Sequence, residues 1–193
     1  MDDFVLYFSL GLNHVLDAAA YDHILFLVVL SVVFSFYQYK KVIGLLSFFT
    51  IGHTLTLALA VYAVVEVEKK LVEFLIPLTI AITGVFNVLR AKRVAMGKEN
   101  FTLFFALFFG LIHGLGFSNY FRAMIGREED KVVPLLEFAL GIEVSQVIVV
   151  FVVLLVGMLL SSLFKVSKRD WIMVCSSIVI GVILPMMLGR VFW

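Results

Sequence analysis

Residues Pro134–Phe164 read PLLEFALGIEVSQVIVVFVVLLVGMLLSSLF, a run in which Glu137 and Glu143 are the only charged side chains. A lipid bilayer has a hydrocarbon core about 30 Å thick, and a helix of about 20 apolar residues crosses it. Within hydrocarbon, a single segment satisfies its own backbone hydrogen bonds only when it is helical. The run therefore predicts a transmembrane helix and assigns the chain to the all-α membrane proteins.

Four further runs on either side of it are long and apolar enough to cross a bilayer: Val42–Val65, Leu71–Leu89, Phe101–Phe117 and Trp171–Phe192. A sixth crossing is predicted from Asp17 or Tyr21 to Phe36, if its polar start enters the membrane. For residues 4–20, which are apolar but interrupted by polar side chains, we expect an interfacial or re-entrant helix, with a seventh span as the alternative. The prediction is a single integral membrane domain, residues 1–193, built as a bundle of six transmembrane helices.

The composition of the whole chain agrees with a membrane protein. Of its 193 residues, 63% are hydrophobic, and the mean hydropathy is +1.11; soluble domains are about 45–50% apolar. The 15 basic and 14 acidic residues gather between the apolar runs, so we expect a lipid bilayer as partner and no nucleic acid. Cys175 is the single cysteine, so a disulfide within the chain is excluded, and we expect it to be a packing residue.

Basic residues are concentrated in alternate loops. The segments Tyr37–Lys41, Arg90–Asn100 and Lys165–Asp170 are net positive, whereas the loops between them are balanced in charge. Because positive loops face the cytoplasm, we expect a multi-pass protein of the cytoplasmic membrane with both termini on its outer side. The acidic start of the chain lacks the positive leading region of a secretory signal, so we expect no cleavage there.

Histidine and carboxylate side chains within the apolar runs are the candidate functional groups, because burying such groups in hydrocarbon is costly. Taken singly, each histidine is as well explained by packing or hydrogen bonding. However, all four are expected in the outer half of the bundle. Imidazole and carboxylate without thiolate suit Ni²⁺, Co²⁺ or Zn²⁺. The predicted ligands of such a divalent metal ion are His14, Asp22, His23, His53, His113 and Glu143.

Uncharged polar side chains recur at helical spacing on three of the predicted spans. On the second span, these side chains share a stripe with His53, and on the third span they are spaced by four residues. On the fifth span, Gln146 lies three residues after Glu143. We expect these stripes to face one another around a wet interior. The predicted pathway-lining residues are Thr50, Thr54, Thr79, Thr83, Asn87 and Gln146.

Gly110 and Gly114 flank His113 within the segment Phe109–Phe117. Two glycines at this spacing let a helix approach a neighbour closely. Helix packing explains both glycines, but it does not explain the imidazole between them.

Four ordered motifs resemble those of the HupE/UreJ family: His14 followed by Asp22-His23-Ile24-Leu25-Phe26-Leu27, then Phe49–Leu57, Phe109–Phe117 and Leu140–Gln146. The likeness covers residues 10–156. Family members are hydrogenase and urease accessory proteins regarded as nickel or cobalt permeases, so the resemblance implies six spans and a functional role for His14, Asp22 and His23. Seven residues separate His14 from Asp22, where the hydrogenase branch usually has five, which points to a divergent branch.

Two functions compete at this stage. A metal permease would capture a hydrated divalent cation at the outer cluster and pass it along the polar interior. An intramembrane metal-dependent hydrolase acting on a lipid or membrane-bound substrate would use three histidine ligands and a metal-bound water, with Asp22 or Glu143 as general base. A metal-dependent scaffold or receptor is a third possibility. The sequence favours the permease and leaves open whether the protein is an enzyme.

Overall fold

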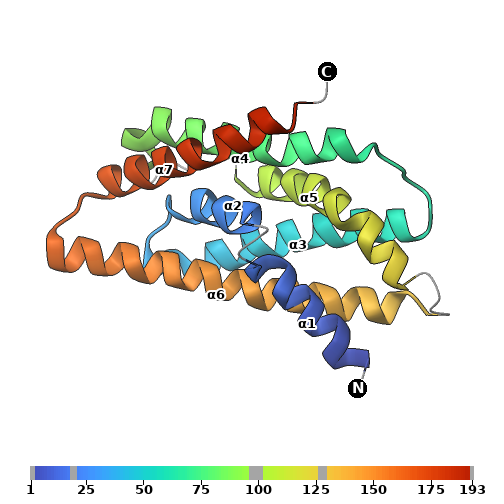
Figure 1. Cartoon of the computed structure of the whole chain (residues 1–193). Helices are drawn as coiled ribbons and strands as arrows, with labels where there is room; N and C mark the ends of the chain where they lie inside the picture. Colours follow the sequence, from blue (N-terminus) through green and yellow to red (C-terminus); the bar gives the residue numbers. More distant parts are fainter. Residues whose placement is uncertain (1–2, 18–20, 96–101, 126–129, 192–193) are drawn as a thin grey trace.

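The computed structural model describes residues 3–17, 21–95, 102–125 and 130–191, and these residues are helical with short connections (Figure 1). No strand occurs among them, which confirms the all-α class. The elements in chain order are α1 (Asp3–Leu16), α2 (Asp22–Ser31), the 3-10 turn η2 (Phe36–Gln38), α3 (Tyr39–Val61), α4 (Lys69–Ala95), α5 (Thr102–Ile125), α6 (Val132–Phe164) and α7 (Lys168–Gly189).

Five of the described helices are long and apolar enough to cross a membrane: Phe36–Val61, Lys69–Arg93, Leu103–Ile125, Val132–Phe164 and Lys168–Gly189. They correspond to the five longest apolar runs of the sequence. The predicted sixth span is not confirmed as one helix, because α2 has only 10 residues and therefore a length of about 15 Å. The segment expected to be interfacial or re-entrant forms α1, and its placement at the membrane stays a prediction.

Helices α1 and α2 follow one another along a single face of α5. Four aromatic or imidazole rings on α1 and α2 contact rings on α5, and the α5 residues that carry these rings are spaced by four. In order, the ring pairs are Tyr7–Phe121, His14–Phe117, His23–His113 and Phe26–Phe109, with centroid distances of 6.4, 4.1, 5.3 and 5.7 Å. Residues four apart lie on one side of a helix, so α1 and then α2 run in the direction opposite to α5. Figure 1 shows them as two separate helices in series, α1 ending at Leu16 and α2 beginning at Asp22.

The C-terminal end of α2 lies inside the bundle and is held by α4. A helix end leaves carbonyl groups without partners within the helix, and each of them must find a donor away from water. The side-chain amide of Asn87 on α4 donates to the carbonyl oxygen of Val29 at 2.7 Å. The Ser31 hydroxyl donates to the carbonyl oxygen of Leu27 at 2.6 Å. Asn87 therefore helps to end a short helix in an apolar environment.

Helices α3 and α5 touch through their backbones. A methyl group added at Gly110 would overlap the carbonyl oxygen of Phe49, and one added at Gly114 would overlap that of His53. The close approach expected from this pair of glycines is therefore confirmed. As a result, α3 and α5 are held together at the level of His53 and His113.

Helices α1 and α6 cross in the same way. A methyl group added at Gly11 would overlap the carbonyl oxygen of Phe138, and one added at Gly141 would overlap that of Phe8. The ring of His14, one turn beyond Gly11, lies 5.7 Å from the ring of Phe138. This crossing fixes the end of α1 that carries His14.

Candidate metal centre

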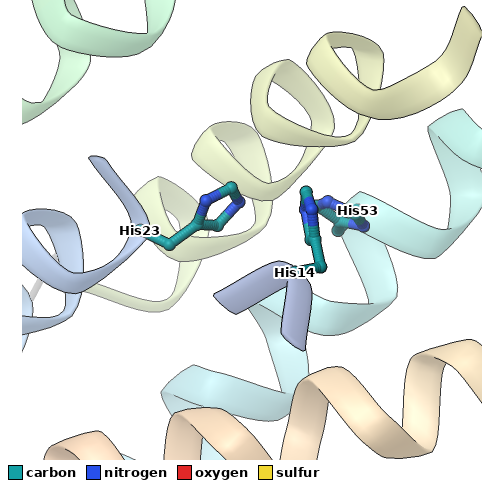
Figure 2. Close-up of side chains that lie close together, drawn as sticks. All are labelled: His14, His23 and His53. Carbon is teal, nitrogen blue, oxygen red and sulfur yellow. The ribbon is translucent and has the colours of Figure 1, made fainter. Parts of the chain in front are cut away.

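Three histidines from three helices converge inside the bundle. His14 comes from the end of α1, His23 from the start of α2 and His53 from α3, and Figure 2 shows their rings close together. Each offers a ring nitrogen, and these three atoms all lie within 4.8 Å of one another. Imidazole nitrogens bind Zn²⁺ at about 2.0–2.1 Å, so nitrogens that share an ion lie within about 4 Å of each other. A side-chain adjustment of about 1 Å would let the three histidines bind one ion.

Four of the six ring nitrogens of this cluster lack hydrogen-bond partners among the described residues. Nε2 of His14, Nε2 of His23 and both nitrogens of His53 are buried and unpaired among the described residues. The His53 side chain has no exposed surface at all. An unpaired buried polar atom costs about 1–3 kcal/mol, and here four such atoms lie together. A metal ion would use nitrogen lone pairs that are otherwise without a partner.

Asp22 holds the ring of His23 in place. Nδ1 of His23 donates to Oδ1 of Asp22 at 3.1 Å, and the backbone N–H of His23 donates to the same oxygen at 2.9 Å. With Nδ1 occupied, Nε2 is left as the ligand atom. A carboxylate in this position fixes the tautomer and orientation of a metal-binding imidazole. Asp22, predicted as a ligand, therefore lies where a residue that orients a ligand would lie.

The second oxygen of Asp22 faces a cation that the sequence analysis did not include. Nη1 of Arg190 lies 3.9 Å from Oδ2 of Asp22 and donates to the carbonyl oxygen of Glu73 at 3.3 Å. Arg190 directly follows α7, so the end of α7 lies beside Asp22, the residue that holds the ring of His23. The sequence signal that could have identified Arg190 is that it is the only charged residue in the apolar run Trp171–Phe192.

His113 lies at the edge of the cluster. Its ring centroid is 5.3 Å from that of His23, and its other neighbours are the rings of Phe26 and Phe49. Both of its ring nitrogens are buried and unpaired in the described part of the chain. His113 is thus placed beside His23 as a possible fourth ligand, outside the group of three.

Glu143 makes its hydrogen bonds elsewhere. The hydroxyl of Ser47 donates to Oε1 of Glu143 at 2.6 Å, and that of Thr50 donates to Oε2 at 2.5 Å. The Thr50 hydroxyl also lies 3.4 Å from Oε1 of Gln146. Two of the predicted pathway residues therefore belong to a polar cluster around Glu143. Ser47, which the sequence analysis did not select, is part of it.

The remaining predicted pathway residues mostly bind backbone carbonyls. The hydroxyls of Thr79 and Thr83 donate to carbonyl oxygens of their own helix, at 2.7 and 2.8 Å, and Asn87 donates to α2. The Thr54 hydroxyl is buried and has no partner among the described residues. Their role as pathway residues stays a prediction.

The sequence model of the family described as "HupE / UreJ protein" matches residues 1–189, nearly the whole chain. This chain belongs to the HupE/UreJ family. The match extends the resemblance, based on motifs between residues 10 and 156, to the last helix as well. Neither the search of curated proteins nor the search of solved structures found a match.

The four HupE/UreJ-like motifs of the chain meet in the structure. The first supplies His14 and the Asp22-His23 pair, the second supplies His53, and the third supplies His113. These residues form the cluster and its edge. The fourth motif supplies Glu143 and Gln146, which join the second motif through Thr50. The protein is thus a membrane protein of the HupE/UreJ family with a histidine cluster that could hold a metal ion.

Proposed function

We propose that this protein is a permease for a divalent transition-metal ion, with Ni²⁺ or Co²⁺ as the cargo and Zn²⁺ as the other ion that the donors suit. The proposal rests on one observation above all. Three imidazoles from three helices each have a ring nitrogen within 4.8 Å of the other two, and four of the nitrogens on these rings are buried and unpaired among the described residues. Neutral nitrogen ligands without thiolate favour these ions over soft metals and over Ca²⁺ or Mg²⁺.

The break between α1 and α2 supports a transport role. With 14 and 10 residues, the two helices measure about 21 and 15 Å, together enough for one bilayer crossing. Transporters commonly bind their ions where a helix is interrupted near the middle of the membrane. His14 precedes the break, and Asp22 and His23 follow it. We therefore assign α1 and α2 to the sixth crossing.

This assignment gives the molecule six crossings and places both termini on one side of the membrane. The basic segments at Lys40, Arg93 and Lys168 then share the opposite side, which the positive-inside rule makes cytoplasmic. Arriving from outside, an ion would exchange bound water for imidazole at the cluster. Asp22 would keep the Nε2 lone pair of His23 directed at the ion.

Sealed proteoliposomes loaded with a metal-sensitive dye test the proposal. Added Ni²⁺ or Co²⁺ should enter vesicles that contain the wild-type protein, and His53→Ala should abolish this uptake. Leu163→Ala, which trims a side chain that is 70% exposed, is the control and should transport normally. Wild-type protein that binds the metal but moves none under any gradient would refute the permease. The intramembrane hydrolase would then become the better explanation.

A further inference from the structure

A second polar cluster joins α3 and α6 next to the histidines. Its centre is the Glu143 carboxylate, and both of its oxygens accept hydrogen bonds from hydroxyls on α3. These donors are Ser47 at 2.6 Å and Thr50 at 2.5 Å. Because Ser47 and Thr50 are three residues apart on α3, one face of that helix presents both hydroxyls to the same carboxylate.

The carboxylate of Glu143 has no cationic partner in the part of the chain that the structure describes. Among the described residues, Glu143 has no lysine, arginine or histidine within ion-pair distance; the carboxylates of Asp22, Glu66 and Glu73 all have one. A carboxylate within a membrane-spanning segment is costly unless it is paired, and such residues mark ion or proton routes. Glu143 therefore has hydrogen-bond donors but no countercharge among the residues described.

Gln146, one turn further along α6, adds an unpaired group. Its side chain is 1% exposed, and its amide nitrogen Nε2 has no hydrogen-bond partner in the described part of the chain. Its Oε1 atom lies 3.4 Å from the Thr50 hydroxyl. Rotating the amide by half a turn would let the nitrogen donate to Thr50 and present the oxygen instead. The cluster then offers carboxylate, hydroxyl and amide oxygens together.

The position of this cluster relative to the histidines follows from α3. Thr50 and Ser47 precede His53 by three and six residues, which is about 4.5 and 9 Å along the helix axis. Both lie on the side of His53 that leads to Lys40 and Lys41 at the start of α3. The oxygen cluster is thus one to two turns from the histidine cluster, towards the basic end of the bundle.

We propose that Ser47, Thr50, Glu143 and Gln146 form a second site for a divalent cation, built from oxygen ligands alone. Oxygen ligands suit Mg²⁺ and Mn²⁺ and bind the transition metals less tightly than imidazole does. The site would accept an ion that leaves the histidines and release it easily. Its place on a transport route rests on the proposed function, whereas its ability to bind a cation does not.

Two metal probes on the purified protein separate the two sites. Mn²⁺, followed by electron paramagnetic resonance, reports the oxygen site, and Co²⁺, followed by its visible absorption, reports the histidine site. Glu143→Gln should weaken Mn²⁺ binding by about tenfold or more and leave Co²⁺ binding unchanged. His53→Ala should do the reverse, so the metal that each variant still binds shows that this variant is folded. Glu73→Gln removes a carboxylate that pairs with Lys69 and should change neither.

The proposal is overturned if Glu143→Gln binds Mn²⁺ as the wild type does, or if His53→Ala abolishes Mn²⁺ binding, which would indicate one shared site. Ser47→Ala provides a milder variant that keeps the charge and should weaken Mn²⁺ binding less than Glu143→Gln. Failure of the permease would look different. Wild-type protein would then bind Mn²⁺ at Glu143 but carry no metal into sealed vesicles.

Discussion

Replacing Gly110 by alanine would put a methyl group onto the carbonyl oxygen of Phe49, where α5 meets α3. The obstacle is backbone, so no side-chain rotation can make room for the methyl group. The two helices would have to separate by about 1 Å to restore ordinary contact. Gly44 on α3 is the matched control, because a methyl group added there has no atom within 4 Å.

The two alanine variants gain the same helix propensity, about 1 kcal/mol, so their difference isolates the cost of the overlap. Forcing an extra methyl group into a packed contact costs about 1–3 kcal/mol. At about 2–4 °C per kcal/mol, Gly110→Ala should melt about 2–12 °C below Gly44→Ala. The separation also displaces His53 and His113, and metal sites tolerate only about 0.2 Å. Co²⁺ binding should therefore weaken in Gly110→Ala alone.

Thermal unfolding of both variants in the same detergent, monitored by tryptophan fluorescence and followed by a Co²⁺ titration, measures both effects. Equal melting temperatures would mean that α3 and α5 do not touch through their backbones at Phe49. A lower melting temperature with unchanged Co²⁺ affinity would separate this helix contact from the metal centre.

Three further outcomes are expected. His53→Ala should abolish Ni²⁺ and Co²⁺ binding measured by equilibrium dialysis while the protein still inserts and purifies; retained binding would exclude it as a ligand. Asp22→Ala should weaken metal binding by about 10–100-fold, whereas Asp22→Asn, whose oxygen still accepts from Nδ1 of His23, should lose much less; equal losses would indicate that Asp22 is itself a ligand. Asn87→Leu leaves the Val29 carbonyl without a donor and should lower the free energy of unfolding by about 1–3 kcal/mol; unchanged denaturation in detergent would contradict that bond.

The longest spans could be predicted from sequence because the bilayer requires about 20 apolar residues in a row. The same criterion does not identify α1 or α2 by itself, since neither helix has about 20 residues. The sequence analysis therefore treated residues 4–20 separately from a sixth span that began at Asp17 or Tyr21. Only the ring contacts show that the two helices lie one after the other along α5.

Grouping the histidines was possible because their depths could be estimated from their positions in the spans. Glu143 shows the limit of that argument. Depth and spacing do not give the rotation of one helix against another, and the structure turns Glu143 towards Ser47 and Thr50. Spacing by four likewise grouped Thr79 with Thr83, yet both hydroxyls bond to their own helix.

The proposed division of one crossing into α1 and α2 has a consequence for how the protein is made. These helices leave the ribosome before α3 to α7. At 14 and 10 residues, each is too short to be inserted as an independent membrane span. Their docking surfaces on α5 and α6 are synthesised more than 80 residues later, which takes several seconds at about 5–20 residues per second. The ring contacts that hold His14 and His23 against α5 and α6 can therefore form only after the C-terminal half of the protein has been synthesised.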